Sequence, residues 1–174
     1  ANDSASMEKF LNAHGDFKSS VYGEEQLFVL ENELVKITLS NKGGKVIAAE
    51  LKNYLSQDSL PVKLFNQEEA DFSFTMALRN NHIVNTSALY FQPVSAITKD
   101  EAGNQKITFR LQSDADAYFD FTYTLPANDY MLDFVVSSKD VNTIMPLGSN
   151  YMIVNWDTKI RQQEKGRQFE ERYS

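Results

Sequence analysis

The feature that most constrains this chain is the alternation of apolar and polar side chains over short segments of its second half. Residues 118–125 read Tyr-Phe-Asp-Phe-Thr-Tyr-Thr-Leu, and residues 107–111 and 132–136 alternate in a similar way. A period of two places alternate side chains on opposite faces of a β-strand, so each segment predicts a strand with one buried face. Turn residues separate these segments at 100–104 and 126–129. The regular spacing predicts an all-β fold, an antiparallel β-sandwich.

A hairpin is predicted in the first half of the chain. Residues 35–40 alternate as Val-Lys-Ile-Thr-Leu-Ser, residues 41–44 read Asn-Lys-Gly-Gly, and an extended pattern resumes over residues 46–55. Glycine reaches positive φ without steric cost, which suits a tight turn between two strands. Residues 79–85 are expected to form a polar loop and residues 68–71 an acidic turn. Further extended segments are expected at 61–65, 72–78, 89–91 and 94–98.

Three regions follow from this pattern. Residues 1–26 form a polar N-terminal segment, in which Ser6 is expected to cap a short helix that ends at Gly15. Residues 27–156 form the β-sandwich domain. Residues 157–174 carry five basic and four acidic side chains and few apolar ones. We expect this last segment to be solvated and to continue in a full-length protein.

Composition excludes several classes of protein. The 174 residues include no cysteine, so a disulfide framework, a thiol nucleophile and a cysteine-based zinc site are ruled out. The net charge of −7 is a poor match for nucleic acid, which binds through Lys and Arg. The longest apolar run is four residues, far below the ~20 of a membrane helix. No signal peptide is visible.

Motifs for catalysis or metal binding are weak. The two histidines, His14 and His82, lie in different polar segments and are expected to be exposed. Asp114, Asp116 and Asp120 resemble the start of a calcium loop, but the glycine and glutamate that an EF-hand needs at its sixth and twelfth positions are absent. We therefore predict no catalytic, cofactor-binding or metal-binding residue.

Two further patterns favour structure over ligand binding. Gly43 and Gly44 follow a strand, but the next residues are extended, whereas a phosphate-binding loop is followed by a helix. The 12 Phe and eight Tyr alternate with polar residues, so most are expected in the core. An aromatic groove for a sugar or a peptide is the alternative interpretation.

Specific stretches of the sequence resemble a known family. The first blocks are residues 28–32 (Phe-Val-Leu-Glu-Asn), residues 35–46 with the Asn-Lys-Gly-Gly turn, and residues 51–54 (Leu-Lys-Asn-Tyr). Later blocks follow in order: 102–104, 121–125, 129–134, 155–156 and 163–167. Together they resemble the large periplasmic domain of the YidC membrane protein insertase family, in its Bacteroides-type branch.

This resemblance implies a β-supersandwich similar to galactose mutarotase, attached to a multi-pass protein at the periplasmic face of the bacterial inner membrane. It implies a non-catalytic scaffold or docking module that assists membrane protein insertion and folding. The implied partners are Sec translocon components and nascent membrane proteins. Two alternatives remain open: a carbohydrate-binding β-sandwich module and a mutarotase-like enzyme. The mutarotase reaction needs a paired acid and base, for which the sequence offers no convincing histidine.

Overall fold

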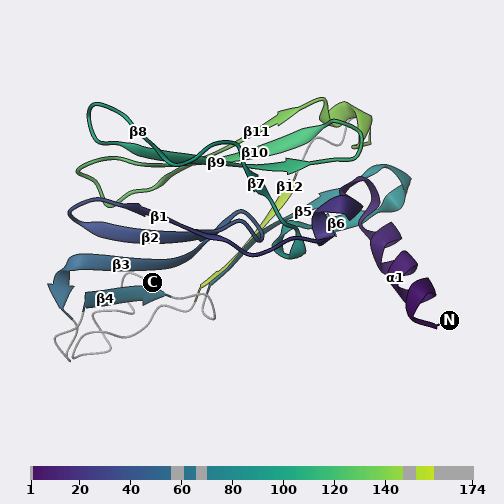
Figure 1. Ribbon diagram of the computed structural model, residues 1–174, viewed down its shortest axis with the longest axis horizontal. Helices are drawn as coiled ribbons and strands as arrows, with labels where there is room; N and C mark the ends of the chain where they lie inside the picture. The colour runs from purple at the N-terminus through teal and green to yellow at the C-terminus, as the bar shows by residue number, and fades with distance from the viewer. Residues whose placement is uncertain (1, 56–60, 66–69, 147–151, 159–174) are drawn as a thin grey trace.

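Two layers of β-strands with a helix at one end make up the molecule (Figure 1). The computed structural model describes residues 2–55, 61–65, 70–146 and 152–158. The helical elements are α1 (Asn2–Ala13) and the 3-10 helices η1 (Gly15–Val21), η2 (Arg79–Asn81), η3 (Thr86–Ala88) and η4 (Val141–Thr143). The strands are β1 (Leu27–Glu31), β2 (Val35–Ser40), β3 (Lys45–Leu55), β4 (Pro61–Phe65), β5 (Ala70–Ala77), β6 (Ile83–Asn85), β7 (Gln92–Pro93), β8 (Thr98–Lys99), β9 (Gln105–Gln112), β10 (Tyr118–Leu125), β11 (Asp133–Lys139) and β12 (Met152–Thr158).

The strands form three antiparallel sheets. One has the order β1-β2-β3-β4, and another has the order β11-β10-β9-β7 with β8 also paired to β9. A third, shorter sheet has the order β12-β5-β6. In Figure 1 the sheet of β7 to β11 lies over the sheet of β1 to β4, and β5 and β6 lie toward the end that carries α1. The prediction of an all-β antiparallel sandwich is confirmed.

Aromatic side chains fill the space between the layers. The inward set of β10, namely Phe119, Phe121, Tyr123 and Leu125, is at most 3% exposed, as the alternation predicts. The Phe121 ring lies 5.0 Å from the Phe74 ring of β5, between centroids. In the same way, Phe109 of β9 contacts Phe28 of β1 at 5.3 Å. The rings join separate sheets, and most of the aromatic side chains that the structure describes lie in the core or pack against it.

The predicted hairpin is confirmed between β2 and β3. The turn places Gly43 at φ 81° and Gly44 at φ 57°. Gly44 also approaches the core, because a Cβ atom there would lie 2.9 Å from Cδ2 of the buried Phe91 ring. The Tyr123 hydroxyl donates a hydrogen bond to the Gly44 carbonyl oxygen at 2.5 Å. Burial raises the pKa of Tyr123 above its usual range, so the hydroxyl stays protonated as a donor.

Two local predictions in the middle of the chain are wrong. Residues 94–98 were expected to form a strand, but residues 94–96 are bends and only Thr98 enters β8. Residues 79–85 were expected to form a loop, yet they include η2 and β6, which pairs with β5. Buried Val84 and the Asn85 amide, which donates to the Ser73 hydroxyl at 3.0 Å, hold β6 in place.

The N-terminal segment contains the expected helix but begins earlier. Helix α1 starts at Asn2, so Ser6 lies inside it and does not cap it, and the helix ends at Ala13 before Gly15. Element η1 was not expected, and its Phe17 is fully buried against the sandwich core. Strand β12 extends to Thr158; the expected acidic turn at Glu68 and Glu69 and the charged residues from 159 onward lie outside the described residues.

Candidate functional site

The two histidines are half-buried, which corrects the expectation that both are exposed. The Gly15 backbone lies against the His82 ring, where a Cβ atom would come within 2.7 Å of its Nδ1 atom. The His14 Nδ1 atom lies 2.9 Å from the Phe10 carbonyl oxygen, and the two rings meet edge to face at 4.8 Å. Both imidazoles therefore contact the N-terminal segment as packing groups.

The three aspartates take separate structural roles. Asp114 accepts a hydrogen bond from the Ser19 hydroxyl at 2.7 Å, and Asp116 lies in the turn before β10 at φ 60°. Asp120 forms a two-bond pair with Arg110 of β9, at 2.8 and 2.9 Å. The pKa of Arg110 is raised chiefly by this hydrogen-bonded carboxylate. Across the described residues, no group of three or more His, Asp or Glu side chains is arranged to hold a metal ion.

Helix α1 and the following η1 border an apolar hollow on the described surface. Phe17 of η1 packs against Phe119 with ring centroids 6.3 Å apart, and the Ser20 carbonyl accepts a hydrogen bond from the Tyr90 backbone at 2.7 Å. These contacts fix η1 to the sandwich. The Tyr22 hydroxyl donates to the Met7 sulfur at 2.9 Å and connects α1 to this anchored segment. These contacts hold α1 beside the sandwich, and a hollow lies between the helix and the residues around Lys42 and Tyr90.

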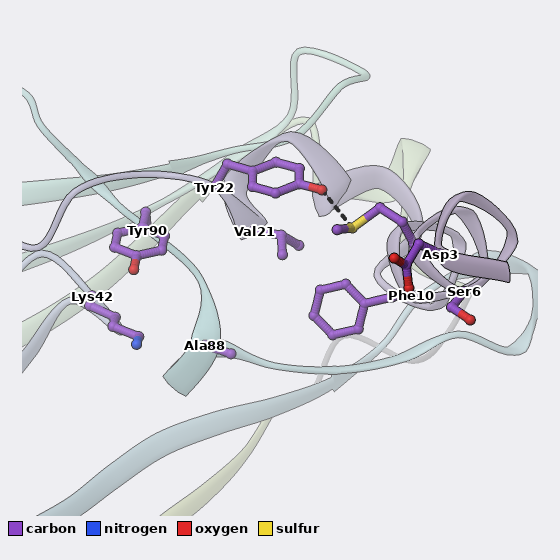
Figure 2. A pocket seen from close by; sticks show the side chains of 9 residues that line it. Asp3, Ser6, Phe10, Val21, Tyr22, Lys42, Ala88 and Tyr90 are labelled. Atoms are coloured by element: carbon purple, nitrogen blue, oxygen red, sulfur yellow. Dashed lines mark hydrogen bonds between the residues drawn. The ribbon is translucent and has the colours of Figure 1, made fainter. Parts of the chain in front are cut away.

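This hollow is an open groove of about 650 Å³, which we call the α1 groove (Figure 2). Its lining comes from four separate parts of the chain: Asp3, Ser6, Met7, Phe10, Val21, Tyr22, Lys42, Ala88 and Tyr90. Met7 and Phe10 are three residues apart, so they share one helix face. They are 48% and 49% exposed, and Tyr22 is 55% exposed. Large apolar side chains that remain exposed and gather in one hollow make it the candidate interaction site of the described surface.

Charge in the groove is confined to its ends. Figure 2 shows Lys42 beside Tyr90 at one end and Asp3 at the opposite end, with Phe10, Val21 and Ala88 between them. The Lys42 ammonium lies 5.7 Å from the centroid of the Tyr90 ring. An apolar segment can cover the middle of such a groove while both charged groups stay hydrated. Covering the exposed half of a Met or Phe side chain stabilises a complex by roughly 1 kcal/mol each.

A second hollow, of about 400 Å³, is polar and lies at the β8–β9 turn. Its residues are mainly occupied with the turn itself: Asp100 accepts hydrogen bonds from the Asn104 side chain and backbone, both at 2.9 Å. These bonds hold the pKa of Asp100 below its usual value of 3.8, and the bond from the Asn104 side chain has the larger effect. The predicted turn at 100–104 is confirmed, and its carboxylate serves to close it.

Sequence reasoning missed the α1 groove, although it predicted a short helix over the segment that contains Met7 and Phe10. Their exposure was not predictable, because it depends on where η1 directs the helix. No helix among the described residues has the length and hydropathy required to cross a bilayer. The described molecule is an all-β sandwich domain with an apolar hollow beside α1.

Comparison with known proteins identifies the family. A model of the YidC periplasmic domain matches residues 27–173. Membrane protein insertase YidC of Parabacteroides distasonis is 36% identical over 98% of this chain, and that of Bacteroides fragilis is 36% identical over 99%. The Porphyromonas gingivalis protein of the same name is 30% identical over 99%. The chain spans about a quarter of the length of these relatives. It belongs to the YidC periplasmic domain family.

Proposed function

We propose that this chain is a non-catalytic docking module of a membrane protein insertase and acts at the periplasmic face of the inner membrane. Its α1 groove binds apolar segments of nascent membrane proteins while they wait to be inserted or folded. Sec translocon components are the second class of partner, which would bring clients to the module. The observation that carries the proposal is the α1 groove, where Met7, Phe10 and Tyr22 remain about half exposed.

The chemistry of the groove supports binding over catalysis. Its titratable groups are a carboxylate, an ammonium and two phenols, and Asp3 and Lys42 stand at opposite ends. An acid–base pair must reach one reacting atom together, within hydrogen-bond distance. Groups separated by an apolar floor suit a segment that is apolar in its middle and polar at its ends. Relatives that share the family carry the name membrane protein insertase, which favours such clients.

A binding titration tests the proposal. The 174-residue chain is titrated into a fluorescein-labelled peptide of Leu and Ala, about 20 residues long and flanked by lysines, and anisotropy is recorded. The Met7→Ser/Phe10→Ser variant is expected to weaken binding about thirtyfold, because two apolar contacts of roughly 1 kcal/mol each are lost. Ile83→Ser is the matched control, since Ile83 is 72% exposed but lies outside the groove.

Two results would contradict the proposal. Equal weakening by the groove variant and by Ile83→Ser would show that the peptide adheres to any exposed apolar residue. Saturable binding of an oligosaccharide, lost on Tyr22→Ala or Tyr90→Ala, would instead support the carbohydrate-binding alternative, since these aromatic rings line the groove.

A further inference from the structure

Among the described residues, strand β11 (Asp133–Lys139) is the last strand at one side of its sheet. It pairs with β10 over seven residues without a register shift, and none of the described strands pairs with its other side. Its sequence, Asp-Phe-Val-Val-Ser-Ser-Lys, contains no proline or glycine. Its side chains are largely exposed, with Val135 at 59% and Val136 at 37%. The strand therefore presents a regular row of backbone groups beside exposed apolar side chains.

Edges of this kind are usually protected. Proteins protect them with bulges, prolines, very short strands or a charge in the middle of the strand, because an open edge pairs with other chains. β11 uses none of these devices between its ends. Its charges are confined to the first residue, Asp133, and the last, Lys139, and neither forms an ion pair with another described residue. The charge pattern therefore restricts which strand fits beside it.

We propose that β11 pairs antiparallel with β11 of a second copy of this chain, about a two-fold axis at Val136. In the register of full overlap, Asp133 lies opposite Lys139 of the second copy, and the same pair repeats at the other end. Val136 lies opposite its own equivalent, and Phe134 and Val135 lie opposite serines. Opposite charges and apolar contacts across strands both stabilise a pair. A parallel arrangement would place like charges together.

The inference goes beyond the proposed function, because the α1 groove is formed by other elements and β11 contributes nothing to its lining. A single strand pair buries less surface than a permanent dimer interface. The dimer is therefore expected to be weak and concentration-dependent. It joins the sheets of two copies through their β11 strands.

The absence of native cysteine allows a direct test of the register. In the 174-residue chain, Val136→Cys is expected to form a covalent dimer under mild oxidation, since residues at a two-fold axis face each other. Asp133→Cys alone should form no covalent dimer, because the equivalent position of the second copy lies six residues away along the strand. A mixture of the Asp133→Cys and Lys139→Cys variants should form a disulfide that joins one chain of each variant. Failure of Val136→Cys to cross-link, or equal cross-linking of Asp133→Cys with itself, would overturn the proposal.

Charge reversal tests the same geometry without oxidation. By sedimentation velocity, Asp133→Lys is expected to raise the dimer dissociation constant about tenfold, since two attractive pairs become repulsive. The double variant Asp133→Lys/Lys139→Asp should restore it, and circular dichroism checks that each variant is folded. A chain that stays monomeric at every concentration would overturn the proposal, as would dimers insensitive to the reversal. Edge pairing only with an added extended peptide would assign β11 to a different partner and also overturn it.

Discussion

Alanine at Gly44 tests how the β2–β3 turn is joined to the core. An L-residue held in the left-handed region costs about 1–2 kcal/mol, and Gly44 has φ 57°. The added Cβ would also lie 2.9 Å from Cδ2 of Phe91. That ring is fully buried and packs against Phe121 with centroids 4.8 Å apart, so it has little room to move. Overpacking of this kind costs about 1–3 kcal/mol.

Gly43→Ala is the matched control. Gly43 has φ 81°, so alanine meets a similar backbone cost there. Its Cβ would touch only the flexible Lys45 side chain, at 3.3 Å. We therefore expect Gly44→Ala to lower the free energy of unfolding by about 2–5 kcal/mol and Gly43→Ala by about 1–2 kcal/mol.

Urea denaturation followed by circular dichroism measures both losses in the 174-residue chain. A domain of ordinary stability has a free energy of unfolding of about 5–15 kcal/mol, so the difference between the two variants can be measured. Equal losses at the two positions would refute the reasoning, because the backbone cost alone would then explain them. A larger loss for Gly43→Ala would show that the turn is not closed against Phe91 as described.

Two other predictions concern hydrogen bonds. Tyr123→Phe removes the buried donor to the Gly44 carbonyl and should lower the free energy of unfolding by about 1–3 kcal/mol. The same change at the half-buried Tyr90 should alter it by no more than about 0.5 kcal/mol, and equal effects at the two positions would contradict the buried bond. The pKa of Asp100 is lowered in the folded chain, so its contribution to stability is present above pH 3.8 and is lost as the pH falls through the folded pKa. In an NMR titration, Asn104→Ala should move that pKa back toward 3.8, and an unchanged pKa would refute the assigned cause.

The sheets were largely predictable because their signal is local. In β9 and β10 every second side chain faces the core, so the period of two gives both the strand and its buried face. The turn at Gly43 and Gly44 was predictable for a similar reason, since glycine adopts the positive φ of a tight turn more readily than any other residue. Prediction failed where contacts between distant segments determine the local structure. β6 exists because Val84 is buried and Asn85 bonds to β5, and neither property shows in a three-residue segment.

The α1 groove was much less predictable than the sheets. It combines residues near positions 3–10, 21–22, 42 and 88–90, which no periodicity connects. The fully buried Phe17 in a polar stretch is the anchor that places α1, and its burial depends on the distant Phe119. The family resemblance, which rests on blocks spread over residues 28–167, supplied the functional expectation that local patterns lacked.

The most direct test of the central claim is site-specific cross-linking in a full-length insertase that carries this domain. A photoreactive phenylalanine analogue replaces Phe10 in the α1 groove or, as a control, Ile83 outside it, while a radiolabelled membrane protein is being synthesised. We predict a cross-linked product between the client and position 10 that appears during synthesis and disappears once insertion is complete, with none at position 83. Absence of the product at position 10, or equal products at both positions, would contradict the claim that the groove binds client segments.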